Sequence, residues 1–472
     1  MDAERQQGKG YQMTFDFEGR AESLRHDQGG EDGIRPARIE ESQTSTASAP
    51  ARALTDRLME EVCRAENLNR AYRRVKANKG APGVDGMTIA QLRPRIAEHK
   101  EELIAALLDG SYRPQPVRGV QIPKPGGGVR QLGIPTVIDR LVQQAILQVL
   151  EPLLDPTFSP SSFGFRPGRG AHDALRQAKR HVADGRLIVV DVDLEQFFDR
   201  VNHDILMSRL SHRIADRRLL RIIRRFLEAG LMQDGVCVAR HEGTPQGGPL
   251  SPLLANLLLD DLDKELERRG HKFCRYADDC NIYVRTRVAG ERVLASLTEF
   301  LEGTLRLRVN REKSAVAYIE ERKFLGYRLL SGGRLGIAPK SLDRAKDRVR
   351  EITRRNRGVG LKQMTTELNS FLTGWVTYFR LAECKNHLRG LDQWIRRKLR
   401  CVRLKYCKRA KTLAHFFQSL GVPAWNSWAT AASGKGWWRL SGSPNAQHAM
   451  NQNWFESLGL VNLVQKYVTF KR

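Results

Sequence analysis

No stretch of the chain approaches the roughly 18 consecutive apolar residues that a membrane-spanning helix needs. No apolar signal-peptide segment follows Met1 either. We therefore expect a soluble, cytoplasmic protein. The seven cysteines are scattered and odd in number, and no two of them form a Cys-x-x-Cys pair. This spacing argues against a disulfide framework and against a structural zinc site, so we expect reduced thiols.

Acidic residues are too few to balance the basic ones. The 472 residues include 79 Lys or Arg and 53 Asp or Glu, which gives a net charge of +26. An excess of this size favours a polyanionic partner; nucleic acid is the first candidate and an anionic membrane surface the second. The length suffices for about two to four domains.

The N-terminal third begins with a polar stretch. Residues 1–55 contain too few apolar side chains to form a core, so we predict a disordered tail. Residues 56–112 show helical periodicity, with one helix from about residue 54 and a second one capped by Thr88. Two strand-like runs around a Gly/Pro turn predict a β-hairpin over residues 117–135.

The middle and the end of the chain differ in composition. Between residues 187 and 330 we predict a strand over residues 187–193 that leads directly into a helix, an apolar helix over residues 253–262 and the hairpin around residues 278–279. A helix around residues 290–305, a strand around residues 307–309 and a hairpin near residues 324–327 follow. This order suits an α+β layer with an antiparallel sheet. From residue 341 the pattern is helical and basic. From about residue 423 it becomes rich in tryptophan and glycine, with few helix or strand runs.

Two groups of carboxylates stand out. Asp278 and Asp279 are adjacent between two strand-like runs, at residues 272–274 and 281–284, and this predicts a tight hairpin turn. Asp191 and Asp193 follow a buried-strand pattern and, being two residues apart, share one face. Neighbouring carboxylates that stay ionised are typical of a site for a hard cation. The alternative is an ordinary solvated turn.

Basic residues gather in two places. Lys124 and Arg130 flank the hairpin turn, as part of either a solvated edge or a finger that closes over phosphates. Residues 341–410 contain 19 Lys or Arg and 6 Asp or Glu, an excess that amounts to half of the net charge of +26. This favours a phosphate-tracking surface over a merely solvated helix face. Its candidate nucleic-acid contacts are Arg396, Arg397, Lys398, Arg400, Arg403, Lys405, Lys408 and Arg409.

The tryptophans of the tail allow two interpretations. Trp425, Trp428, Trp437, Trp438 and Trp454 lie within 30 residues of one another. Clustered tryptophans most often make a small core. With the neighbouring basic side chains of Lys435 and Arg439 they also suit stacking on bases.

The order of several motifs resembles bacterial group II intron reverse transcriptase–maturases over roughly residues 56–472. The matching segments are residues 78–86, 122–124 with 130–135, 162–168, 193–199, 245–247, 276–279, 307–314, 324–327 and 374–379. One such motif alone is weak evidence for a family. This many motifs in the expected order argue strongly against the alternative of an ordinary solvated turn at residues 278–279.

The resemblance implies a right-hand polymerase with α+β fingers and palm and an α-helical thumb. The N-terminal extension would cover residues 56–112 and the fingers and palm residues 113–335. The thumb, or maturase domain X, would cover residues 341–415, and a small nucleic-acid-binding region residues 416–472.

The resemblance also implies roles for single residues. Asp193, Asp278 and Asp279 would hold two Mg²⁺ ions and catalyse RNA-directed DNA synthesis. The nucleotide pocket would contain Lys124 and Arg130 on the triphosphate, Phe198 under the sugar and Gln246 along the wall. Asp191 matches no ligand position of the family motif, and we expect it to be salt-bridged or to support the ligands from outside.

The implied partners are group II intron RNA, an RNA template with a DNA primer, target DNA and deoxynucleoside triphosphates. The C-terminal region has none of the paired cysteines of a His-Asn-His endonuclease, so we expect no DNA-cleaving domain. Two alternatives belong to other classes. A maturase that only binds RNA is disfavoured by the intact aspartates, and a reverse transcriptase of CRISPR spacer acquisition or phage defence is disfavoured by the lack of a fused nuclease segment.

Overall fold

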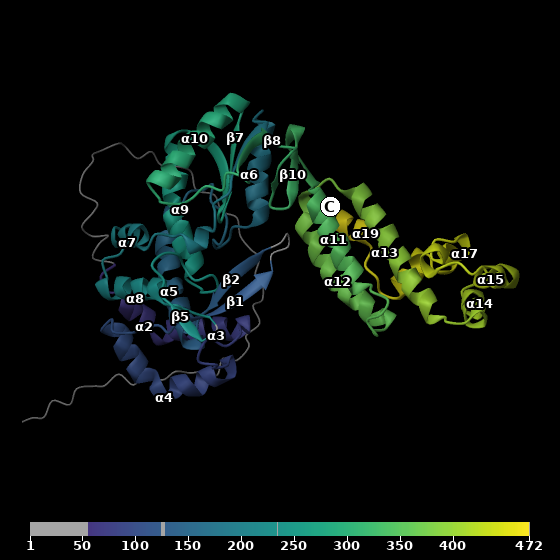
Figure 1. The fold of residues 1–472 in the computed structure, drawn as a ribbon, viewed down its shortest axis with the longest axis horizontal. Coiled ribbons are helices and arrows are strands. Elements are labelled where there is room, and N and C mark those ends of the chain that lie inside the picture. The colour runs from purple at the N-terminus through teal and green to yellow at the C-terminus, as the bar shows by residue number, and fades with distance from the viewer. Residues whose placement is uncertain (1–54, 124–127, 234, 472) are drawn as a thin grey trace, which may run out of the picture. The chain divides into compact units, whose positions relative to one another are not determined.

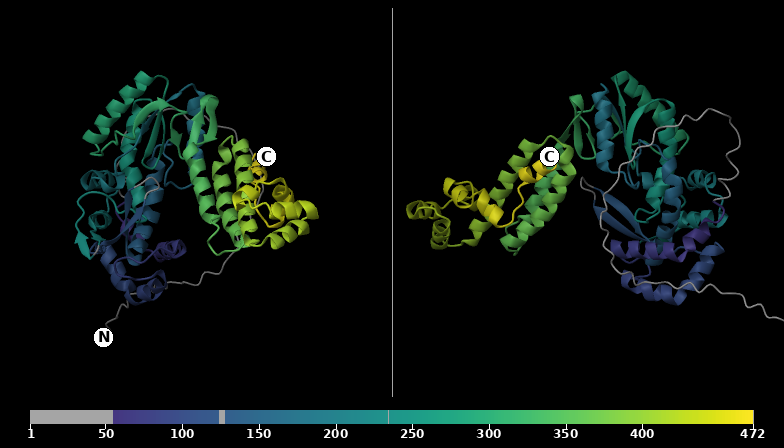
Figure 2. Two further views of the ribbon diagram at one scale, coloured as in Figure 1. Left: turned by 45° about the vertical axis from the view of Figure 1, so that its right-hand side comes forward. Right: turned by 180° about the vertical axis from the view of Figure 1, so that it is seen from behind.

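The computed structural model describes residues 55–123, 128–233 and 235–471 and divides the chain into two compact units. Unit 1 comprises the chain up to Gly170, Asp191–Cys280 and Glu291–Ala315. Unit 2 comprises Ala171–Val190, Asn281–Gly290 and Val316–Arg472. The expected tail at residues 1–55 lies, except for its last residue, outside the described residues. Figures 1 and 2 show the ribbon from three directions.

Helices form the N-terminal part of unit 1. They are α2 (Leu58–Cys63), α3 (Ala65–Asn78) and α4 (Ile89–Leu108), which pack with α5 (Val137–Leu154). The single helix expected from residue 54 is two helices, because Arg64 has an extended ψ of 136° between them. Thr88 begins α4 as predicted, and its backbone N–H donates to Gln91 Oε1 at 2.8 Å.

The predicted basic hairpin is confirmed. Strands β1 (Val117–Pro123) and β2 (Val129–Ile134) pair antiparallel with Ile122 opposite Arg130. β4 (Leu231–Gln233) and β5 (Val236–Val238) extend this sheet in the order β2-β1-β4-β5. Residues 124–127 at the turn, which include Lys124, lie outside the described residues.

A second four-stranded sheet has the order β6-β7-β3-β8. Asp191 and Asp279 lie on its strands, and Asp193 and Asp278 lie directly beside them. Its strands are β6 (Lys272–Tyr276), β7 (Asp279–Val284), β3 (Ile188–Val192) and β8 (Ala315–Tyr318). Of these four strands, only β6 lies wholly within unit 1, and the other three are each divided between the two units. Unit 1 contains α7 (His203–Ser211), α8 (Arg217–Glu228) and α9 (Ser251–Arg268). The hairpin expected around Asp278 and Asp279 is therefore present as β6 and β7, and α9 is longer than the expected helix.

Two local expectations were wrong. The helix expected directly after Asp193 is a single 3₁₀ turn, Phe197–Asp199, because Gln196 adopts a left-handed conformation with φ of 50°. The strand expected near Val309 is one isolated antiparallel bridge between Leu194 and Val309. It follows α10 (Arg287–Gly303), which agrees with the predicted helix.

Unit 2 is built around long helices. α11 (Pro339–Ile352), α12 (Leu361–Tyr378) and α13 (Lys385–Tyr406) lie side by side, as the green helices of Figures 1 and 2 show. The sheet β11-β10-β9 precedes them, with strands β9 (Lys323–Phe324), β10 (Tyr327–Leu330) and β11 (Arg334–Ile337). α6 (Ala171–Ala183) also belongs to this unit.

The helical period of α13 explains its place in unit 2. Leu388, Leu391, Ile395, Leu399 and Val402 recur every three or four residues and are buried, so one side of α13 faces a core and the other is free to carry charge.

The C-terminal region is helical, contrary to the expectation of few regular elements. It contains α14 (Ala410–Ser419), α15 (Ala424–Ala431), α16 (Trp437–Leu440), α17 (Pro444–Ala449), α18 (Gln452–Ser457) and α19 (Leu463–Thr469). Three of these begin at polar caps, because Ser443, Asn451 and Asn462 accept hydrogen bonds from the first helical turn. Helices this short contain too few turns to show a clear period of apolar residues, so they could not be recognised from the sequence.

A buried carboxylate ties α19 to α13. Asp392 accepts hydrogen bonds from the backbone N–H groups of Leu463 and Val464 at the start of α19. Burial raises the pKa of Asp392 to about 6, although these hydrogen bonds oppose the shift.

Among the described residues, every helix is too short or too polar to cross a membrane.

Candidate active site

The two adjacent aspartates lie where β6 turns into β7. Ala277 at this turn has a positive φ of 57°, a conformation that non-glycine residues adopt only where their surroundings impose it. Gly164 lies directly against the turn, since a Cβ on Gly164 would be 2.2 Å from the backbone nitrogen of Ala277. Only glycine permits this approach, and the turn is thus held by the chain segment that packs on it.

A fully buried arginine holds the same turn from inside. The Arg275 guanidinium forms a two-point ion pair with Asp263 of α9, with contacts of 2.7 and 2.6 Å. It also donates to the side chains of Ser162 and Asn256 and to the carbonyl oxygen of Ala277, at 2.7, 3.0 and 2.9 Å. Arg275 therefore connects α9 and the segment around residue 162 to the backbone next to Asp278.

Asp193 directly follows β3 and is fixed through its backbone. Its N–H donates to Ser314 Oγ at 3.0 Å, and its carbonyl oxygen accepts from the Asn310 N–H at 2.9 Å. The Lys313 ammonium lies 3.6 Å from a carboxylate oxygen of Asp193. Residues 310–314 thus determine where the Asp193 carboxylate lies and supply its nearest basic partner.

Asp193 and Asp278 come from different segments and interact electrostatically. Burial raises the pKa of Asp278, the nearby charge of Asp193 raises it further, and Arg130 and Arg275 act in the opposite direction. Asp279 is exposed beside Asp278. In the part of the chain that the structure describes, no three His, Cys, Asp or Glu side chains converge as a ready-formed metal cluster.

The carboxylates nevertheless suit a hard divalent cation. Asp193 and Asp278 would offer carboxylate oxygens to such a cation, and a cation between them would offset the unfavourable interaction that raises the pKa of Asp278.

Three of the four predicted nucleotide-pocket residues belong to connected segments. The carbonyl oxygen of Phe198 accepts a hydrogen bond from Thr244 N–H at 2.6 Å, which ties the 3₁₀ turn to the loop that carries Gln246. The carbonyl oxygen of Gln246 in turn accepts from the Gly133 N–H of β2 at 3.0 Å. Arg130 is exposed on β2, close enough to Asp278 to affect its pKa. The fourth, Lys124, lies outside the described residues.

Three residues that shape this site were not predicted from the sequence. Gly164 and Arg275 position the turn, and Lys313 contacts Asp193. An arginine within an otherwise apolar strand run was the available signal for Arg275. Burial raises the pKa of the Cys280 thiol, and the charge of the half-buried Asp191 raises it further; the expected supporting role of Asp191 stays a prediction.

The eight basic residues predicted to contact RNA do not share one environment. Lys408 and Arg409 are exposed, whereas Arg396, Arg397, Lys398, Arg403 and Lys405 are half-buried. The Arg403 guanidinium lies 4.0 Å from the centre of the Phe416 ring. Arg400 differs from the rest because it is 8% exposed and its Nε donates to the carbonyl oxygen of Met450 at 3.0 Å. Arg400 therefore contributes to packing in unit 2 and is not included in the proposed surface.

Comparisons with known proteins place the chain in a family. Residues 122–329 match the reverse transcriptase (RNA-dependent DNA polymerase) family. Residues 342–421 match the group II intron, maturase-specific domain. Protein YkfC of Escherichia coli is 35% identical in an alignment of 316 positions that covers 58% of this chain and 83% of YkfC. The chain therefore belongs to the reverse transcriptases that carry a group II intron maturase domain, as its motifs predicted.

Other relatives are matched over less of their length. The group II intron-encoded protein LtrA of Lactococcus lactis is 38% identical over 206 residues, so the match spans 43% of this chain and about a third (34%) of LtrA. Among solved structures, a partial Cas6-RT-Cas1–Cas2 complex is 25% identical with a TM-score of 0.35, covering 52% of this chain and 42% of that chain. Telomerase from Candida albicans is 13% identical with a TM-score of 0.40, covering 74% of this chain and 64% of that chain. The family assignment rests on the sequence matches, and the predicted α+β fold agrees with it.

Proposed function

We propose that the protein is an RNA-directed DNA polymerase that extends a DNA primer on an RNA template. The observation that carries this is that Asp193 directly follows β3 and Asp278 directly precedes β7, the strand next to β3 in the same sheet, within a chain of the reverse transcriptase family. The attacking group is the primer 3′-hydroxyl, the target is the α-phosphate of a deoxynucleoside triphosphate, and pyrophosphate leaves.

Asp193, Asp278 and Asp279 are the residues that would hold Mg²⁺, which neutralises charge on the phosphates and activates the 3′-hydroxyl. The other residues position the substrate. Arg130 on β2 and Lys124 beside the hairpin turn pair with the triphosphate. Gln246 lines the pocket, where its amide nitrogen lies 3.5 Å from an Asp199 carboxylate oxygen.

The direct test is primer extension by the purified protein on an RNA template with deoxynucleotides and Mg²⁺. We expect full-length DNA that depends on the RNA template and disappears when EDTA removes the metal. A protein that binds the template–primer without extending it would contradict the polymerase assignment.

Phe198→Ala should admit ribonucleotides. The 3₁₀ turn and the Thr244 hydrogen bond hold Phe198 next to the Gln246 loop, where a ring excludes a 2′-hydroxyl by its volume. We expect discrimination between deoxy- and ribonucleotides to fall by roughly tenfold or more, in line with about 1–3 kcal/mol for a changed pocket contact. Competition between the two nucleotide types during primer extension measures it.

Phe300→Ala, a half-buried ring on α10, is the control and should leave the discrimination unchanged. Equal discrimination in Phe198→Ala and in the unaltered protein would assign the sugar gate to another residue.

We also propose that the protein is a maturase that binds group II intron RNA to promote splicing and retrohoming. The match of residues 342–421 to the maturase domain supports this, together with the basic surface of α13 in the same segment. A template–primer duplex and target DNA are the further nucleic-acid partners. The same family resemblance supports the proposed division into domains. These are an N-terminal extension (56–112), fingers and palm (113–335), a thumb or domain X (341–415) and a nucleic-acid-binding region (416–472).

Replacing Arg396, Arg397 and Lys398 with alanine should weaken binding to intron RNA. Each lost phosphate contact should also flatten the dependence of log affinity on log salt by about one unit, because fewer counterions are released. The measurement is the dissociation constant for the intron RNA at several salt concentrations. The control removes three exposed charges elsewhere, at Arg217, Arg221 and Lys272. An unchanged slope in the α13 triple variant would mean that these three side chains make no phosphate contacts.

A further inference from the structure

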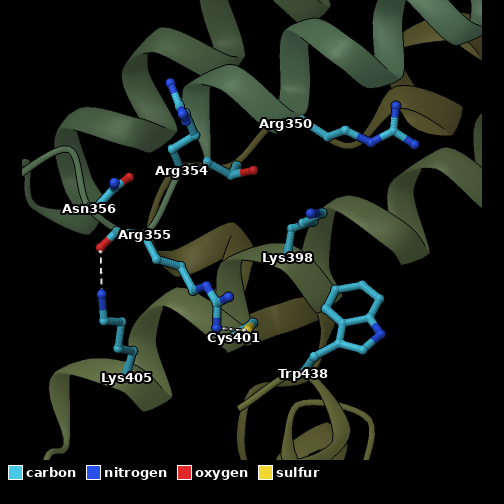
Figure 3. Close-up of a pocket in the computed structure, with 9 residues that line it drawn as sticks. Arg350, Arg354, Arg355, Asn356, Lys398, Cys401, Lys405 and Trp438 are labelled. Atoms are coloured by element: carbon cyan, nitrogen blue, oxygen red, sulfur yellow. Dashed lines mark hydrogen bonds between the residues drawn. The ribbon is translucent and has the colours of Figure 1, made fainter. Parts of the chain in front are cut away.

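Unit 2 contains a cavity of about 700 Å³ between the end of α11 and one face of α13. Figure 3 shows the residues around it. Its lining is Arg350, Thr353, Arg354, Arg355, Asn356, Lys398, Cys401, Lys405 and Trp438. The volume lies within the range of small-ligand pockets, roughly 300–1,000 Å³.

The charge of this pocket is strongly one-sided. Five of its lining residues are Arg or Lys and none is Asp or Glu. Arg350 pairs with Asp347, which lies outside the lining. Within the described residues, no salt bridge neutralises Arg354, Arg355, Lys398 or Lys405. The Lys405 ammonium instead donates a hydrogen bond to the carbonyl oxygen of Arg355 at 3.1 Å, which Figure 3 marks with a dashed line between these two residues.

Repulsion among these cations is visible at Lys398. Burial lowers the pKa of the Lys398 ammonium, and the charges of Arg350 and Arg355 lower it further. The folded protein holds positive charges together here without matching acids, so an anionic ligand relieves an unfavourable interaction that is already present.

An aromatic wall accompanies the charge. Trp438 is 40% exposed and lines the pocket, although large aromatic side chains are usually more buried. The guanidinium carbon of Arg397, which is not among the lining residues, lies 4.2 Å from the centre of the Trp438 ring, and the Lys398 ammonium lies 5.3 Å from the same centre. An indole plane next to a cluster of cations suits a ligand with a flat ring and a phosphate.

We propose that this pocket holds one unpaired nucleotide of bound RNA, with its base stacked on Trp438 and its phosphate between Arg355 and Lys398. A nucleotide in a duplex has both base faces covered and does not present its ring to Trp438. An unpaired one does, and stacking on an aromatic side chain is the common way in which proteins recognise it. This inference rests on the proposed RNA binding and adds to it a preference for an unpaired nucleotide at one place.

The test compares two RNA hairpins that differ only in one unpaired adenosine, chosen because a purine covers much of an indole. We expect the intact protein to bind the hairpin with the unpaired adenosine roughly tenfold more tightly than the perfectly paired hairpin. Trp438→Ala should abolish this preference, while Trp438→Phe should keep most of it. Trp425→Ala, which removes a tryptophan that is 82% exposed on α15, is the matched control and should leave the preference intact.

Each outcome distinguishes the pocket from RNA binding as such. Salt-dependent binding of both hairpins with equal affinity would overturn the pocket while leaving the maturase proposal standing. Binding of neither hairpin nor intron RNA would overturn the maturase proposal. If Trp438→Ala does not fold, Arg355→Ala tests the phosphate side of the pocket, alone and combined with Trp438→Phe. An unchanged preference for the unpaired adenosine in either variant would count against the pocket as a nucleotide site.

Discussion

Asp278→Asn should lower primer extension roughly a thousandfold or more while leaving the fold intact. The substitution preserves the shape of the side chain but removes the charge that the proposed Mg²⁺ site would need. Burial and the neighbouring Asp193 already raise the pKa of Asp278, so a neutral side chain relieves this unfavourable interaction, and we expect stability to be unchanged or slightly higher. Single-nucleotide incorporation measured under saturating template–primer gives the loss in rate.

The control for this variant is Asp56→Asn, an exposed carboxylate in the N-terminal part of unit 1, which should extend primers normally. Asp278→Asn should still bind intron RNA and promote splicing at moderate salt, because the basic surface of α13 is unaltered. Extension at the normal rate by Asp278→Asn would refute the active-site assignment. Loss of splicing in a folded variant would refute a maturase function that is independent of polymerisation.

Gly164→Ala is expected to reduce extension about a hundredfold without touching any charged residue. The added Cβ would lie 2.2 Å from the Ala277 nitrogen and 2.9 Å from the Tyr276 carbonyl carbon, so the turn that bears Asp278 must move. A displacement of about 1 Å at a reacting group is enough for a loss of this size. The effect should appear in the maximal rate, with template–primer affinity nearly unchanged.

Gly303→Ala is the matched control, because a Cβ on Gly303 meets nothing within 4 Å. It should extend primers at the normal rate. Thermal unfolding of both variants separates a displaced turn from a general loss of structure. Normal activity in Gly164→Ala would show that the turn tolerates the shift and that its position is less critical than the packing indicates.

Local sequence patterns were sufficient for the elements that carry the site. The β1–β2 hairpin and the β6–β7 turn each follow from alternating strand residues around turn residues, a signal contained within about 20 positions. The placement of Asp193 at the end of a buried strand follows from the same kind of pattern. These predictions needed no knowledge of distant contacts.

Contacts between distant segments could not be predicted in this way. Gly164 is a glycine because of Ala277, more than 100 residues away, and no local pattern announces this contact. The burial of Arg400 was missed because α13 alternates basic and apolar residues, so its charge suggested exposure although it lies on the packed side. The left-handed Gln196 was missed because a non-glycine residue gives little sign of such a conformation.

The contacts of Arg275 also bear on the order of events during folding. Its guanidinium reaches Ser162, which is 113 positions away, as well as Asn256 and Asp263, 19 and 12 positions away. Contacts of high sequence separation form only after the entropy of closing long loops has been overcome. The turn that bears Asp278 should therefore order late, after α9 has formed and the segment around residue 162 has docked. If the proposed metal and nucleotide site is correct, a newly made chain would complete it among its last folding steps.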